Sequence, residues 1–448
     1  MRKYVSLFVS LFFIPVLALA DATSTDYDKN WPQWRGPNAN GVSLYGKAPV
    51  KWDESKNIKW KIEIPGNGHA TPLIWGDQIF VLTAIKIDKK IESQKEVPAQ
   101  GQDQGFGMSI STDNVHKFAI FAINRSDGSI IWQHTAREEL PHEGAHSTGN
   151  WASNSPITDG EHVFAYFGSR GLYCYDMQGK LIWGKDFGDM TIRRTFGEGS
   201  SPALYKDKIV VNWDHEGQSF IIALDKNTGK ELWKRDRDEG TSWATPLIVE
   251  SNGKPQVITN ATSKIRSYDL ATGQLLWESS GMTQNVIPSP VTANGMVYIM
   301  SGYMGNALQA IRLSAAKENI AGSTALVWTL DKDTPYIPSP LLYDDMLYFM
   351  SGMGGNSLSC VNAGTGEAYY SSQKLEGLGN LLYASPVGAN GKVYITSRKG
   401  TTLVIKHGAQ YEVLASNKLD DSFSASPVIV DNELYLRGDK YLYCIVEK

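Results

Sequence analysis

Short apolar runs separated by polar turns recur along the chain. Runs of four or five apolar residues have the length of strands, and turns rich in Gly, Asn and Asp favour antiparallel hairpins. A Ser-Pro or Thr-Pro dipeptide precedes such a run eight times. These dipeptides begin at Thr71, Ser155, Ser201, Thr245, Ser289, Ser339, Ser385 and Ser426. Successive dipeptides lie 41 to 50 residues apart, except that the first interval of 84 residues holds an insertion around residues 86–115.

Each repeat unit predicts four strands. The run after the dipeptide ends in a tight turn such as Asn294-Gly295, and a second apolar run such as 296–299 follows. A third run leads to a Gly turn such as 227–229, and the fourth run carries a Trp, as at Trp233. Units of about 40–45 residues with four antiparallel strands predict the blades of a β-propeller.

A small residue in the third strand precedes the Trp by a nearly constant distance, which tests this register. The spacing is ten residues from Ala122 to Trp132 and from Ala223 to Trp233, and nine from Cys174 to Trp183. All three cysteines occupy this small position, in different units; they are Cys174, Cys360 and Cys444. Because blades keep these positions apart, we expect buried thiols that form no disulfide.

The eighth unit lacks its own fourth strand. Residues 57–62 alternate as a strand and include Trp60, so they can complete that unit and close the ring. Closure removes exposed sheet edges. We therefore predict an all-β fold over residues 57–448, an eight-bladed β-propeller of four-stranded antiparallel blades closed by an N-terminal strand.

Residues 1–20 have the features of a secretory signal peptide: a basic start, an apolar run and an Ala-Leu-Ala end. No cysteine follows the predicted cleavage site, which excludes a lipid anchor there, and no later apolar run is long enough to span a membrane. We expect a periplasmic or secreted monomer. Residues 21–56 form an N-terminal extension, and we expect the aromatics of WPQWRGPNANG (31–41) to pack against the side of the propeller.

The formal charge of −4 gives no electrostatic signature of nucleic-acid binding. The strand order puts the loops between strands two and three, and between successive blades, on one face. That face carries the long polar segments 134–153, 186–201 and 212–219, whereas the opposite face has short turns. Binding residues gather on long loops held by a rigid scaffold, so we expect function on the loop-rich face.

HEGAH (142–146) matches the zinc-hydrolase pattern H-E-x-x-H. That chemistry requires a helix that brings both histidines to one side. Pro141 and Gly144 argue against a helix, and the stretch connects two blades. We expect a loop, in which His142 or His146 binds a metal with a neighbouring loop or makes hydrogen bonds.

Three further groups share this face. Asp214, His215 and Glu216 could bind a metal, act as acid and base, or form a solvated turn. Arg193 and Arg194 suit a carboxylate, phosphate or sulfate, or an internal salt bridge with Glu198 and Asp189. Four aromatic residues precede Ser/Thr-Pro dipeptides at the channel rim, where they could stack on a sugar or planar ring or pack between blades. These are Trp151, Trp243, Tyr336 and Tyr383.

The repeat is clearest in ALDKNTGKELW (223–233) and SYDLATGQLLW (267–277). It resembles the PQQ-type propeller repeat of quinoprotein dehydrogenases and of the outer-membrane assembly lipoprotein BamB. WPQWRGPNANG, PHEG (141–144), FGEGSSPALY (196–205) and NWDHEG (212–217) look like a group of secreted bacterial PQQ-repeat proteins. The resemblance implies the fold, and leaves function open.

The departures from this family matter for function. The dehydrogenases carry a vicinal Cys pair against the quinone, which this sequence lacks, and their calcium ligands have no match here. The lipidated Cys of BamB is also missing. We therefore expect no catalytic residue and a scaffold that binds a protein or glycan through the loop-rich face. The alternatives are a PQQ- or metal-dependent oxidoreductase and a BamB-like envelope assembly factor.

Overall fold

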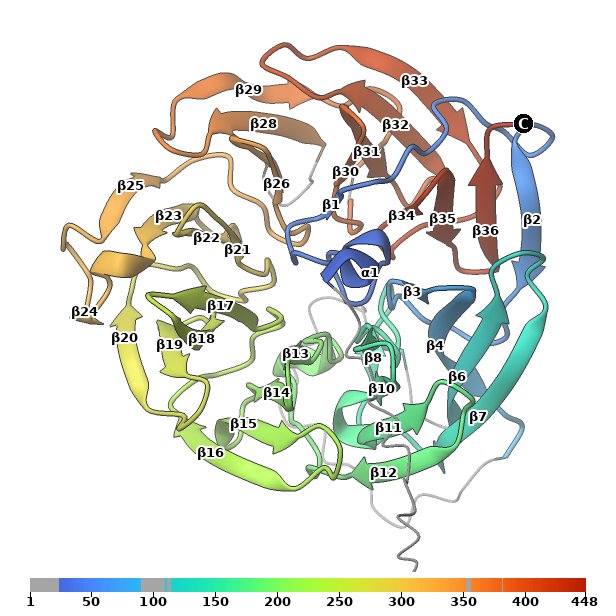
Figure 1. Ribbon diagram of the computed structural model, residues 1–448, viewed down its shortest axis with the longest axis horizontal. Helices are drawn as coiled ribbons and strands as arrows, with labels where there is room; N and C mark the ends of the chain where they lie inside the picture. The colour runs from blue at the N-terminus through green and yellow to red at the C-terminus, as the bar shows by residue number, and fades with distance from the viewer. Residues whose placement is uncertain (1–23, 90–108, 111–113, 352–355, 381) are drawn as a thin grey trace, which may run out of the picture.

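A computed structural model describes residues 24–89, 109–110, 114–351, 356–380 and 382–448. Eight antiparallel sheets stand around a central axis, each contributing one blade (Figure 1). The predicted eight-bladed propeller is thus confirmed. The expected signal peptide lies outside the described residues, and so does most of the insertion before Val115. Among the described residues, no helix is long and apolar enough to cross a membrane.

The first four blades follow the chain from the inner to the outer strand. Blade 1 consists of β3 (Leu73–Trp75), β4 (Gln78–Lys86), β6 (His116–Asn124) and β7 (Ile130–Glu139). Blade 2 consists of β9 (Ile157–Thr158), β10 (His162–Tyr166), β11 (Leu172–Asp176) and β12 (Leu181–Lys185). Blade 3 consists of β13 (Ala203–Tyr205), β14 (Lys208–Trp213), β15 (Ser219–Asp225) and β16 (Glu231–Arg237). Blade 4 consists of β17 (Leu247–Ser251), β18 (Lys254–Thr259), β19 (Ile265–Asp269) and β20 (Leu275–Ser279).

The other four blades complete the ring. Blade 5 consists of β21 (Val291–Ala293), β22 (Met296–Ser301), β23 (Ala307–Arg312) and β25 (Leu326–Leu330). Blade 6 consists of β26 (Leu341–Tyr343), β27 (Met346–Met350), β28 (Ser357–Asn362) and β29 (Ala368–Lys374). Blade 7 consists of β30 (Val387–Ala389), β31 (Lys392–Thr396), β32 (Thr401–Lys406) and β33 (Val413–Lys418). Blade 8 consists of β34 (Val428–Val430), β35 (Glu433–Arg437), β36 (Tyr441–Val446) and the N-terminal strand β2 (Ile58–Glu63).

The predicted closure and register are both confirmed. β2 pairs antiparallel with β36, with Trp60 opposite Cys444. The equivalent pairing of the third and fourth strands puts Cys174 opposite Trp183 in blade 2 and Cys360 opposite Tyr370 in blade 6. All three cysteines are buried and free. Burial raises the pKa of each thiol to about 12, so these cysteines serve as small core residues and stay protonated at neutral pH.

The Ser/Thr-Pro dipeptides form a ring of hydrogen bonds that runs around the axis. In each blade the backbone N–H of the Ser or Thr donates to the hydroxyl of its counterpart in the next blade. Ser426 closes the ring by donating to the Thr71 hydroxyl over 3.3 Å. This explains why every repeat needs a hydroxyl residue there: it satisfies a buried donor of its neighbour.

The tryptophans join neighbouring blades. The Trp132 ring nitrogen donates to the Met177 carbonyl oxygen of blade 2 at 3.1 Å, and Trp183 donates to Lys226 of blade 3 at 2.8 Å. Each ring lies under the Gly turn of the next blade, where a Cβ on Gly179 would come within 2.7 Å of Trp132. The Gly and the Trp of the repeat are therefore required by the same inter-blade contact.

The N-terminal extension corrects one expectation. Its aromatics do not simply pack against the side of the propeller, because Trp31 is 1% exposed and pairs with Ile74 of the inner strand β3. The helix α1 (Ser24–Lys29) lies at the centre of the ring in Figure 1. The short strand β1 (Val42–Ser43) pairs parallel with the inner strand β30. The extension thus covers the short-turn end of the channel.

Arg35 is the deepest charged residue of this extension, at 2% exposure. Its guanidinium donates to the carbonyl oxygens of Pro386 and Pro340 at 2.8 and 2.7 Å. Those prolines belong to the dipeptides of blades 7 and 6. Arg35 therefore connects the extension to the same inner ring that the blades share.

Candidate functional site

The HEGAH stretch is a loop, as expected. Only Ala145 and His146 form a short strand, β8, which pairs with β5 (Ser109–Ile110). His142 Nδ1 accepts a hydrogen bond from Arg170 at 2.7 Å, and its Nε2 lies 2.6 Å from the Met190 carbonyl oxygen. Since arginine only donates, Nε2 must carry the proton and donate to Met190. Both ring nitrogens are engaged, so this geometry favours the hydrogen-bonding alternative for His142.

Two carboxyl groups tie the loops of blades 1 to 3 together. Both Glu143 oxygens accept the Ile192 N–H at 3.2 Å. The Glu198 carboxylate accepts the N–H and the hydroxyl of Ser169 at 2.7 and 2.5 Å. The Glu198 carboxylate occupies the space that a side chain at position 168 would need, because a Cβ added to Gly168 would lie 1.4 Å from Glu198 Oε2. Gly168 also has a φ of +57°. Only glycine satisfies both conditions, which shows how closely Glu198 fits the loop.

Burial is the main cause of altered acidity at these groups. It raises the pKa of Glu143 to about 8, helped by the nearby charges of Glu198 and Asp189. It also raises the pKa of Glu198, against the hydrogen bonds of Ser169 and the charges of His142 and Arg170. The pair lines a narrow cleft together with Trp151, Phe118 and Phe167. A protonated carboxyl group can donate there, but is a poor ligand for a cation.

Trp151 and Trp243 anchor the loops that carry them. The Trp151 ring nitrogen donates to the Glu143 carbonyl oxygen at 3.1 Å, and Trp243 donates to Gly197 at 2.7 Å. Both rings are half-buried. These hydrogen bonds favour the packing alternative for Trp151 and Trp243.

The channel mouth brings several predicted residues together. Arg193 lies 3.4 Å from the Asn285 side-chain oxygen, and Asn285 in turn bonds Tyr336. The Tyr336 ring lies 4.9 Å from that of Tyr303, centroid to centroid. Arg194, exposed and with φ of +54°, exerts its charge on Tyr336. The loop 186–201 therefore meets residues of blades 4 to 6 across the mouth.

A second chain of contacts bridges opposite sides of the mouth. Tyr383, before blade 7, shares a hydrogen bond of 2.8 Å with the Thr148 hydroxyl of the HEGAH loop. Thr148 also bonds His146 Nδ1 at 2.7 Å. The Arg398 guanidinium lies 4.8 Å from the centre of the Tyr383 ring. Sequence reasoning missed Thr148, Tyr303, Asn285 and Arg398, because their contacts join loops that are far apart along the chain.

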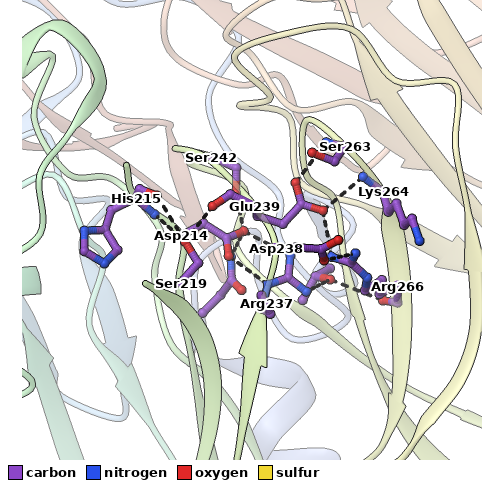
Figure 2. Close-up of polar contacts among 12 residues, drawn as sticks. Asp214, His215, Ser219, Arg237, Asp238, Glu239, Ser242, Ser263, Lys264 and Arg266 are labelled. Carbon is purple, nitrogen blue, oxygen red and sulfur yellow. Dashed lines mark hydrogen bonds and ion pairs between the residues drawn. The ribbon is translucent and has the colours of Figure 1, made fainter. Parts of the chain in front are cut away.

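Asp214, His215 and Glu216 do not converge on one point. Figure 2 shows Asp214 bound to Arg237 and to Ser242, and its oxygens lie 2.7 and 2.6 Å from these partners. His215 Nδ1 accepts the Thr191 N–H at 3.0 Å. Glu216 accepts the N–H and hydroxyl of Thr241. Asp214 and Glu216 thus bind neighbouring residues of the segment 237–242, whereas His215 binds the loop that carries Thr191. The three side chains share no common centre, and the metal site stays a prediction.

Another acidic cluster lies on the short-turn face. Among the described ranges, the group with ligand atoms close enough for one ion, within 4.8 Å, is Asp159, Glu161 and His162. Asp159 already forms an ion pair of 2.5 Å with Lys226 of blade 3. This contact connects two blades and accounts for the cluster without an ion.

Buried charges between blades 3 and 4 form a network that the sequence did not reveal (Figure 2). Arg237 and Asp214 have fully buried side chains and pair at 2.7 Å. Glu239 accepts from Arg266 at 2.7 Å and from the N–H groups of Ser263 and Lys264. Every charge in this network has a partner, so its role is to fix two blades and the loop between them.

The quinone site implied by the resemblance does not fit these residues. The three cysteines lie in separate blades, so none can form the vicinal pair. The loop-face carboxyl groups Glu143 and Glu198 are bound to N–H donors, and burial favours their neutral form. Carboxyl groups bind calcium in their ionised form, so these two glutamates are poorly suited to hold the ion that accompanies a quinone. We therefore derive no chemistry through a quinone.

Comparisons with solved structures agree with the propeller fold. BamB from Moraxella catarrhalis aligns with a TM-score of 0.51 and 16% identity, over 82% of this chain and 100% of that chain. Quinohemoprotein alcohol dehydrogenase from Comamonas testosteroni aligns with a TM-score of 0.62 and 12% identity, over 96% of this chain and 82% of that one. At such identities the likeness shows the fold alone.

Sequence comparisons point to the same group. BamB of Francisella salina is 30% identical over 26% of this chain and 23% of its own length. Tetrathionate hydrolase of Acidithiobacillus ferrooxidans is 22% identical over 66% of this chain and 57% of its own length. The chain therefore spans under two thirds of these curated relatives. A family described as outer membrane protein assembly factor BamB matches residues 116–370, more than half of the chain. With its blade register and inter-blade tryptophans, the protein belongs to this family of PQQ-type β-propellers.

Proposed function

We propose that the protein is an exported scaffold that binds a partner, a protein or a glycan, through the loop-rich face at the channel mouth. The observation that carries this proposal is the convergence there of Arg193, Arg194, Tyr336 and Tyr383, supplied by loops far apart in sequence. Arginine and tyrosine are enriched where proteins bind others, because they combine large contact area with hydrogen bonding.

The state of the titratable groups supports binding over catalysis. The histidine and carboxyl groups of this face, including His142, Glu143 and Glu198, hold loops together through hydrogen bonds. A rigid set of loops binds with little loss of conformational entropy. Membership of the BamB family agrees with a protein partner, and the predicted signal peptide agrees with a place in the cell envelope.

Site-specific photo-crosslinking in the bacterial envelope tests the proposal. A benzophenone amino acid in place of Met304, which is 79% exposed in the β22–β23 loop of this face, should give a discrete adduct. The matched control carries it at Asn252, exposed in the short β17–β18 turn of the opposite face, and should give none. Equal adducts from both positions would contradict the proposal.

The oxidoreductase alternative is tested on the same purified protein. Adding PQQ with Ca²⁺ should leave dye-linked alcohol or sugar oxidation at background and produce no quinone spectrum in the protein fraction. Turnover that requires both additions would replace the scaffold proposal with an enzymatic one.

A further inference from the structure

Arg437, the last residue of β35, is buried without a protein partner. The residue is 1% exposed. None of its three guanidinium nitrogens has a hydrogen-bond partner among the described residues. Burying a charged group without acceptors is among the most unfavourable arrangements in a protein. Its five N–H donors therefore need acceptors that the chain does not supply.

The strand register gives the direction of this side chain. Glu433, Tyr435 and Arg437 alternate onto one face of β35, and the first two contact Arg125 of blade 1. Arg437 thus faces the junction of blades 8 and 1, at the loop-rich end of the strand.

The nearby carboxylates do not accept hydrogen bonds from Arg437. Asp421 and Asp439 act on Arg437 only through their charge. Asp421 accepts the N–H groups of Ser422, Lys440 and Tyr441. Asp439 lies 3.5 Å from His69 Nε2 and is also under the charge of Arg398. The two carboxylates are thus bound to other donors, and the guanidinium nitrogens of Arg437 remain without acceptors among the described residues.

The other blades show that the fold does not require a charge at this position. The inner-strand pairs Val291–Tyr298, Leu341–Tyr348 and Val428–Tyr435 are equivalent. Two residues further along, blades 5 and 6 have Met300 and Met350, both buried, where blade 8 has Arg437. A methionine of similar length therefore fits this position, and the guanidinium calls for another explanation.

We propose that Arg437 is the anchor of a buried anion subsite at the loop-rich end of β35. The planar fork suits two oxygens of a sulfate, a phosphate or a carboxylate. The anion is either a free ion or the acidic group of a ligand that enters from the loop-rich mouth. This subsite is separate from the partner contacts proposed above.

Thermal unfolding of the wild type and of Arg437→Met tests the subsite with sulfate, phosphate and acetate, each against chloride at equal ionic strength. Sulfate or phosphate should raise the melting temperature of the wild type saturably, while the variant should show only the general salt effect. Removing the fork should weaken apparent affinity at least about tenfold. Without added anion, the variant should melt at the wild-type temperature or above it. Arg312→Met, an exposed site on β23, should respond like the wild type.

A crystal of the wild type soaked in selenate gives an independent answer, including the case in which the variant fails to fold. Selenate within hydrogen-bond distance of Arg437 supports the subsite. Ordered water alone at the guanidinium, or equal sulfate responses of wild type and Arg437→Met, overturns it. A response to acetate alone supports the subsite and identifies a carboxylate ligand as its occupant.

Discussion

The two ends of the central channel are closed in different ways. At the short-turn end the N-terminal extension binds mostly through backbone groups: Trp31 pairs with Ile74, and Gly41 accepts from Gly388 at 2.9 Å. At the loop-rich end, side chains make the contacts, many of them charged or titratable. Backbone pairing fixes a segment whatever its side chains, whereas side-chain networks can respond to pH and to a ligand. We therefore assign structure to the first end and recognition to the second.

The largest expected effect is at the short-turn end. Trp31→Ala should lower the free energy of unfolding by about 3–5 kcal/mol, because it removes a large ring that is 1% exposed. Urea unfolding measures it. Tyr45→Ala, in the same extension but 52% exposed, should change it by less than about 0.5 kcal/mol. If Trp31→Ala abolishes the Met304 crosslink while the protein stays folded, the two ends are not independent.

The hydroxyl ring lies at the loop-rich end of the inner strands, and offers a structural contrast there. Ser201→Ala leaves the Ser155 N–H without its acceptor and should destabilise the protein by about 1–3 kcal/mol. Ser201→Thr keeps the hydroxyl and should retain most of the stability. Equal losses in both variants would mean that packing, and not the hydrogen bond, matters at this position.

The pH dependence should belong to the loop-rich end. Because burial raises the pKa of Glu143 to about 8, its contribution is complete below the unfolded value near 4.5 and is lost as pH rises through about 8. The free energy of unfolding of the wild type should therefore fall between pH 5 and 8. In Glu143→Gln, whose side chain stays neutral, that fall should be smaller by on the order of 1–2 kcal/mol. Urea midpoints at several pH values measure this. Glu138→Gln, on the outer strand β7, is the control and should leave the fall unchanged.

The smallest expected change in stability is that of Tyr383→Phe. The substitution removes the hydroxyl that bonds Thr148 across the channel mouth and should cost about 0.5–1.5 kcal/mol. Its greater effect should be on partner binding, because the two loops lose a link that holds them over the mouth. Crosslinking from Met304 should fall in this variant while the melting temperature hardly moves. An unchanged crosslink would place the partner away from the Thr148–Tyr383 bridge.

Most of the fold followed from the periodicity, because each blade repeats the same local requirements. The Gly turn must lie over the Trp of its neighbour, and the Ser/Thr hydroxyl must accept a neighbour's N–H, so both recur at fixed spacing. The same spacing assigned the cysteines to small core positions and residues 57–62 to the last blade, where the structure has β2. The candidate residues of the loop-rich face were found from loop length and rim position.

The partners of those residues were not predictable in the same way. Thr148 and Tyr383 are 235 positions apart, and loops vary between blades, so no repeat signal connects them. Asp214 was marked as a candidate ligand, yet its partner Arg237 comes from the end of an outer strand. Composition shows that a charge exists, but only the packing shows what neutralises it.

The sequence by itself determined the number of blades, their register, the closing strand and the inert state of the cysteines, since all of these depend on spacing along the chain. Only the tertiary structure decided the path of residues 24–56 over the short-turn end, the bridge across the channel mouth and the open fork of Arg437. These features depend on contacts between residues brought together by ring closure. The strength of these polar interactions depends on how deeply the tertiary structure buries them, and no local sequence pattern encodes that burial.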